Sequence, residues 1–111
     1  MPAIEKFFPR LTPKYRLMLW LLSKGVTVDD VRAMSVGDLK AWRSRIPAEF
    51  VDIRDAIDII AQQCDSDSTA FATSAGRKYS AKNIADLVER AHKIAGVKYK
   101  GVAAFVSSFA K

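Results

Sequence analysis

Two closely spaced helix starts constrain the fold of this chain most. They lie in residues 23–39, SKGVTVDDVRAMSVGDL, where Thr27 and Ser35 are each followed three residues later by an aspartate, Asp30 and Asp38. A hydroxyl at such a position accepts a hydrogen bond from the first turn of a helix, and the carboxylate lies near the positive end of the helix dipole. The stretch therefore predicts two successive short helices joined by tight turns.

Apolar residues at helical spacing predict further helices on both sides of this stretch. A strongly apolar helix should begin at Thr12-Pro13, run to Lys24 and form the buried centre of the protein, with Gly25 in the left-handed conformation after it. Residues 1–10 should be an irregular lead-in whose aromatic residues pack on the core. Three later helices are expected over residues 47–64, 81–95 and 102–110, with Ser80 and Gly96 at the two ends of the second. In the first of these, the apolar stripe of Phe50, Ile53, Ile57 and Ile60 should be widened by Val51, Ala56 and Ile59.

Length and composition fit one compact domain. The chain has 111 residues, of which 50% are apolar and 27% charged, so a sizeable core is possible. We therefore predict a single, mainly α, multi-helix domain over residues 1–111 with little or no sheet. No apolar run is long enough to span a bilayer, and the first ten residues lack the pattern of a signal peptide.

Few residues are available for metal or acid–base chemistry. Cys64 is the single cysteine and His92 the single histidine, so no intramolecular disulfide or zinc cluster can form, and a cytoplasmic setting is expected. We interpret Cys64 as a semi-buried structural cysteine and His92 as a partly buried, hydrogen-bonded histidine. Asp52, Asp55 and Asp58 should form a solvated helix face. The sequence contains no phosphate-binding, zinc-protease or hydrolase motif, so we predict no catalytic residue, metal or cofactor.

The positive charge is concentrated in the last forty residues. Residues 1–71 contain ten Lys/Arg and ten Asp/Glu, whereas residues 72–111 contain eight Lys/Arg against Asp86 and Glu89. The net charge of +6 therefore arises entirely from the C-terminal segment. A basic half attached to a neutral half favours a face that contacts a polyanion, most often nucleic acid. A solvated basic surface that improves solubility is the alternative.

Four segments, in order, resemble the catalytic domain of the tyrosine recombinase (phage integrase) family. RLMLWLLSKGVTVDDVRAMSVGDL is similar to an apolar helix followed by the family pattern TGLRISELLxLxWxDI, and RIPAEFVDIRDAIDII to IPLPxxLxxxLxxxL. TAFATSAGRKYSAKNIADLVERAHKIAGV resembles LFxSxxGxxxSxxxIxxLLKRAxxxAGI, and AAFVSSFAK resembles HxLRHTFA. The resemblance covers about residues 11–110 and implies the helical core of that domain.

The departures from the family pattern fall on its catalytic residues. The first family arginine aligns with Thr27 and the second with Val106, while the two histidines align with Ala103 and Ser107. The segment with the nucleophilic tyrosine would lie beyond Lys111. The family arginines hold the scissile phosphate as a charge clamp, which neither threonine nor valine can replace. The resemblance therefore implies a protein that is not an enzyme.

The resemblance also implies which residues contact DNA. They lie in and beside the predicted helix 81–95: Arg77, Lys78, Ser80, Lys82, Asn83, Arg90, Lys93, Lys98 and Lys100. These side chains can donate hydrogen bonds to phosphates and base edges, although Ser80 can equally be only a helix cap. The function expected is a catalytically inactive, recombinase-like DNA-binding regulator of phage or mobile-element origin. A protein-interaction module, which docks on a recombinase or another protein or self-associates through the C-terminal helix, is the second hypothesis.

Overall fold

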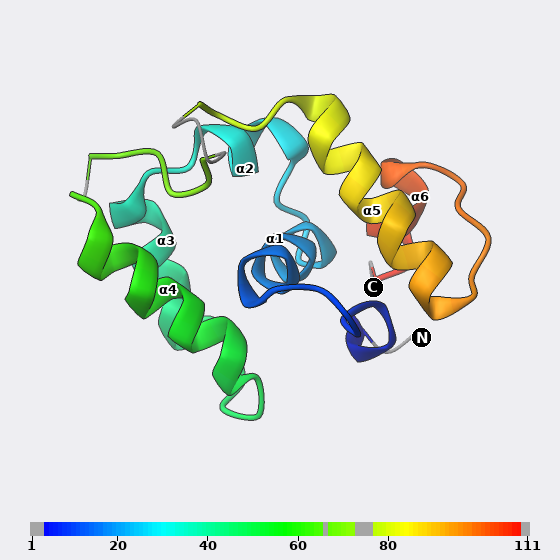
Figure 1. The fold of residues 1–111 in the computed structure, drawn as a ribbon, viewed down its shortest axis with the longest axis horizontal. Helices are drawn as coiled ribbons and strands as arrows, with labels where there is room; N and C mark the ends of the chain where they lie inside the picture. Colours follow the sequence, from blue (N-terminus) through cyan, green and yellow to red (C-terminus); the bar gives the residue numbers. More distant parts are fainter. Residues whose placement is uncertain (1–3, 66, 73–76, 110–111) are drawn as a thin grey trace.

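The computed structural model describes residues 4–65, 67–72 and 77–109, and this part of the chain is mainly helical (Figure 1). Its elements are two 3-10 turns, η1 (Ile4–Phe7) and η2 (Arg43–Arg45), and six α-helices: α1 (Pro13–Ser23), α2 (Val28–Ala33), α3 (Val36–Trp42), α4 (Val51–Gln63), α5 (Ala81–Ala95) and α6 (Val102–Ser107). In these ranges there is no strand, only two isolated antiparallel bridges, Ser35 with Thr69 and Ala72 with Lys78. The prediction of a mainly α fold is confirmed.

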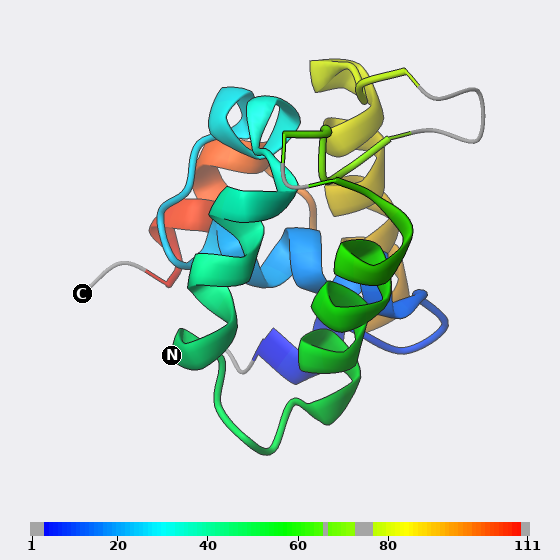
Figure 2. The same ribbon diagram turned by 90° about the vertical axis from the view of Figure 1, so that its left-hand side faces the viewer.

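Helix α1 is the centre of the protein, as its apolar sequence predicts. Its six residues Leu17–Leu22 are all buried, and α2, α4 and α6 all contact it. In Figure 1, α3 and α4 lie on one side of α1, and α5 and α6 lie on the other. Figure 2 shows α3 and α4 side by side in front of α1. A helix that is apolar on most of its surface needs this kind of cover on several sides.

The helix junctions have the geometry that the sequence predicts. The Thr27 hydroxyl accepts a hydrogen bond from the Asp30 backbone N–H at 3.1 Å, and Ser35 and Asp38 form a reciprocal capping box. After α1, Gly25 has φ of 91°, and its N–H donates to the Leu22 carbonyl. A residue in the left-handed region closes the last turn at little cost only when it is glycine.

The N-terminal lead-in packs on the core beside α5 and α6. The Phe7 ring lies 5.0 Å from the ring of His92 and 5.3 Å from that of Phe105, measured between centroids. Phe7 and Phe8 are buried, which confirms that the lead-in aromatics dock on the core. Phe105 of α6 is buried beside Phe7. His92 is also buried, and its Nδ1 lies 2.7 Å from the Val88 carbonyl oxygen, as expected for a hydrogen-bonded structural histidine.

The predicted helix 47–64 is wrong at its start and in part of its apolar face. Helix α4 begins at Val51, because Pro47 opens a turn in which the Phe50 N–H donates to the Pro47 carbonyl at 3.0 Å. Val51 is 55% exposed and Ile59 is 53% exposed, so neither widens the buried stripe. The narrower stripe of Ile53, Ala56 and Ile57 is buried.

Two further predictions near the loops need correction. Cys64 is exposed at the end of α4, not semi-buried, because the chain leaves the helix there in an extended conformation. Helix α6 ends at Ser107, while Ala110, the predicted end, lies outside the described residues. None of the helices described has both the length and the apolar character needed to cross a membrane.

Candidate nucleic-acid interface

Helix α5 carries the candidate interface, and it is capped at both ends. Its buried face consists of Ile84, Leu87, Val88, Ala91 and His92. At its start the Ser80 hydroxyl accepts from the Asn83 N–H at 3.0 Å, and the Asn83 side-chain oxygen accepts from the Ser80 N–H at 3.2 Å. At its end Gly96 has φ of 72°. Ser80 and Asn83, two predicted DNA contacts, therefore have a structural role in the capping box.

Basic side chains gather where the chain enters α5. Arg77, Lys78 and Lys82, all predicted contacts, are exposed there. Next to them, the Tyr79 carbonyl accepts a hydrogen bond from the Nε of Arg32 in α2 at 2.7 Å. The ammonium of Lys14 in α1 lies 5.2 Å from the centroid of the Tyr79 ring. We call these five cations, Lys14, Arg32, Arg77, Lys78 and Lys82, the N-terminal cluster.

Sequence reasoning missed Lys14 and Arg32. Lys14 donates to the Ala72 carbonyl at 3.3 Å across 58 residues of chain, and Arg32 reaches Tyr79 across 47 residues. No local pattern marks such long-range contacts, since they exist only after α1 and α2 have packed beside the start of α5. Arg32 also lies 3.4 Å from the Asp29 carboxylate, so part of its charge is balanced.

Arg90 lies on the flank of α5 that faces α1. It lines a pocket of about 150 Å³ together with Tyr15, Tyr79, Asn83 and Asp86. The Tyr15 and Tyr79 rings meet edge to face with centroids 6.5 Å apart. The pKa of the Tyr15 hydroxyl is raised, chiefly by its interaction with the Tyr79 side chain and then by burial, while the charges of Lys14 and Arg90 act in the opposite direction.

A second group of predicted contacts lies in the last turns of α5 and in the loop after it, which runs back along the helix (Figure 1) and brings the Tyr99 ring to 5.2 Å from the His92 ring. Lys93, Lys98 and Lys100 are exposed, and we call them the C-terminal cluster. The Lys93 ammonium is 4.0 Å from the Glu89 carboxylate, a long and exposed pair that leaves the lysine accessible. Tyr99, between the two loop lysines, has a raised pKa because of burial first and the charges of Glu89 and Asp86 second.

The start and the end of α5 are separated by the length of the helix. A helix of 15 residues is about 22 Å long at 1.5 Å per residue. Asp86 is exposed and Glu89 half-exposed between the clusters, so the outward face of α5 carries both signs of charge at its middle. The structure thus places the predicted residues on one helix and in the segments that flank it, with two acidic side chains among them.

The positions that align with the recombinase arginines carry no charge in this fold. The Thr27 hydroxyl is used in capping α2, and Val106 is partly buried against the core. Ala103 and Ser107, which align with the histidines, are exposed on α6.

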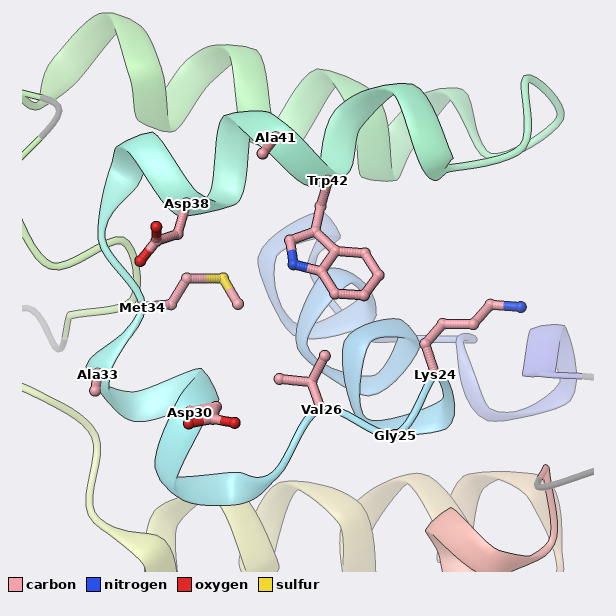
Figure 3. Close-up of a pocket in the computed structure, with 9 residues that line it drawn as sticks. All are labelled: Lys24, Gly25, Val26, Asp30, Ala33, Met34, Asp38, Ala41 and Trp42. Carbon is pink, nitrogen blue, oxygen red and sulfur yellow. The ribbon is translucent and has the colours of Figure 1, made fainter.

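A second concave feature lies on the side of α2 that faces away from α5 (Figure 3). It is a groove of about 660 Å³ between the end of α1, α2 and α3 (Figure 3), and we call it the α2–α3 groove. Its lining residues are Lys24, Gly25, Val26, Asp30, Ala33, Met34, Asp38, Ala41 and Trp42. The groove shares no residue with either basic cluster. The described residues contain no group of three or more acidic, histidine or cysteine side chains arranged to hold a metal ion.

Comparison with known proteins identifies no relative: no protein-family model, curated protein or solved structure matches the chain. The recombinase resemblance and the DNA-binding residues therefore remain predictions from the sequence.

Proposed function

We propose that this protein binds duplex DNA through α5 and its flanking segments and acts as a catalytically inactive, recombinase-like regulator. The observation that carries the proposal is the charge distribution, since the whole net charge of +6 arises from residues 72–111. The lysines and arginines of residues 77–100 are all exposed and lie on or beside one helix. Such a surface attracts a polyanion and releases its counterions on binding.

The dimensions of α5 suit contact with one duplex. The helix is about 22 Å long, which corresponds to six or seven base-pair steps of about 3.4 Å along one strand. Phosphates on a single DNA molecule would be contacted by Lys78 and Lys82 at its start, by Lys93 near its end, and by Lys98 and Lys100 in the loop beside it. The acidic residues at the middle of the helix, Asp86 and Glu89, would then face a groove rather than a phosphate.

The proposed regulatory role rests on the positions that align with the catalytic arginines of the recombinase family. Thr27 and Val106 cannot hold a phosphate in place of two arginines, so DNA would be occupied but not cut. A protein of this kind, of phage or mobile-element origin, acts by covering a site as a repressor, an anti-repressor or an accessory recombination factor.

Fluorescence anisotropy of a labelled duplex, titrated at low and at physiological salt, tests the proposal. We expect binding that weakens steeply as salt rises, because each phosphate contact releases counterions. Failure to bind duplex DNA at low salt would refute it. Incubation with a nicked suicide substrate should yield no covalent complex, and a covalent complex through Tyr15, Tyr79 or Tyr99 would refute the inactive assignment.

A protein-interaction module is the second candidate, but α6 is a poor surface for it. Phe105 is buried, and Val102, Val106 and Phe109 pack against the core, so the large apolar residues in and after α6 are used within the molecule. The α2–α3 groove is a better candidate surface for a partner than α6, because it is open and partly apolar. Size-exclusion chromatography with light scattering distinguishes self-association from a monomer that binds DNA.

A further inference from the structure

The α2–α3 groove has an apolar floor between two acidic walls. Figure 3 shows the Trp42 ring extending from α3 toward Val26, with Met34 beside it and the carboxylates of Asp30 and Asp38 on the α2 and α3 sides. Trp and Met side chains are enriched where proteins bind one another, because they bury much area and adapt to shape.

The Trp42 ring is held in place before any partner arrives. It meets the Trp20 ring edge to face at 5.8 Å, and the Arg45 guanidinium lies 4.1 Å from its centroid. A preordered aromatic ring lowers the entropy cost of binding.

The two carboxylates are not neutralised by the protein itself. Within the described chain neither Asp30 nor Asp38 has a cation within ion-pair distance. Lys24, the one cation that lines the groove, points out of it, and its ammonium lies 5.5 Å from the Trp20 ring centroid (Figure 3). The groove therefore presents two carboxylates without ion pairs in a protein whose net charge is +6.

We propose that the α2–α3 groove binds a lysine- or arginine-bearing segment of a protein partner. The cationic side chain would lie between Asp30 and Asp38, and neighbouring apolar side chains of the segment would pack on Met34 and Trp42. Charge complementarity selects this occupant, since an acidic peptide or DNA would be repelled by the walls.

Helix capping explains why an acceptor stands at positions 30 and 38, but it does not require that the acceptor be negatively charged. Asp30 and Asp38 each stand at the third position of a short helix, where an acceptor supports the first turn. In α5 an uncharged residue, Asn83, fills the same position and completes the capping box. Aspartate-to-asparagine variants can therefore remove the charge of the groove and keep the caps.

The probe for this proposal is a fluorescein-labelled short peptide that alternates lysine with leucine, with a second peptide in which glutamate replaces lysine. Anisotropy should show that the lysine peptide binds and the glutamate peptide does not. The double variant Asp30→Asn/Asp38→Asn should weaken binding of the lysine peptide by about two- to thirtyfold, the range expected for loss of two exposed ion pairs. In ¹⁵N-labelled protein the indole N–H signal of Trp42, assigned with Trp42→Phe, should shift on binding.

The matched control is Glu49→Gln/Asp55→Asn, which removes two exposed charges beside and on α4 and none from the groove. It should bind the lysine peptide as the wild type does. The proposal is overturned if the lysine peptide does not bind, if the glutamate peptide binds equally, or if the control weakens binding as much as the groove variant. Thermal unfolding of both variants confirms that they are folded, and the result is independent of DNA binding because the surfaces are separate.

Discussion

Substitution of Ser80, at the start of α5, tests whether this residue caps the helix or contacts DNA. Its hydroxyl accepts from the Asn83 N–H at 3.0 Å, as one half of a capping box. Replacement by alanine leaves that N–H without its side-chain acceptor, and loss of such a cap costs about 1 kcal/mol. In a domain of this size, Ser80→Ala should therefore lower the melting temperature by about 3–6 °C. DNA affinity should change less than twofold, because the hydroxyl is already used within the helix.

Two further variants complete this test. Ser80→Asp keeps a cap acceptor but adds a negative charge to the N-terminal cluster, so it should retain stability and weaken DNA binding at low salt. Thr12 precedes α1 but makes no side-chain cap hydrogen bond, so Thr12→Ala should cost clearly less than Ser80→Ala in a thermal melt. The reasoning fails if Thr12→Ala is as damaging as Ser80→Ala, or if Ser80→Ala alone abolishes DNA binding.

Three more outcomes are expected. Phe71 is fully buried although it lies outside any helix, so Phe71→Ala should lower the free energy of unfolding by about 3–5 kcal/mol in a urea titration; a loss below about 1 kcal/mol would contradict its place in the core. Gly96→Ala should cost about 1 kcal/mol by the same assay because φ is 72°, and an unchanged urea midpoint would argue against this backbone conformation. The pKa of both Tyr15 and Tyr99 is raised on folding, so their contribution to stability is complete below the ordinary tyrosine value of about 10 and is lost as pH rises through the folded value. Between pH 9 and pH 11, the urea midpoint of the wild type should therefore fall by more than that of Tyr15→Phe. An equal fall in the two proteins would contradict this.

Helix ends are the part of the fold that the sequence predicts best, because their chemistry is local. The caps at Thr27, Ser35 and Ser80 and the left-handed glycine at Gly96 each depend on residues within one turn. The start of α4 lacks such a signal: its first turn has no side-chain cap, and Pro47 fits a turn as well as a helix start.

Exposure and long-range contacts could not be read from local patterns. Val51 and Ile59 match the apolar spacing of α4, but each borders an open pocket beside α1 and remains more than half exposed. The extra cations of the candidate interface, Lys14 and Arg32, reach Tyr79 only through tertiary packing. The capping aspartates Asp30 and Asp38 are visible in the sequence, but the groove exists only because the chain turns between α2 and α3 and places the two helices on either side of it (Figure 3).

The salt dependence of DNA binding by a cluster variant tests the central claim most directly. Each lost phosphate contact should reduce the slope of log affinity against log salt by about 0.9. Lys78→Gln/Lys82→Gln should therefore bind duplex DNA more weakly than the wild type, with a slope smaller by about 1.8. Lys24→Gln/Lys40→Gln, which removes two exposed lysines outside both clusters, should keep most of the wild-type slope. Equal reductions in the two variants, or binding that does not respond to salt, would contradict the assignment of α5 as the DNA-binding surface.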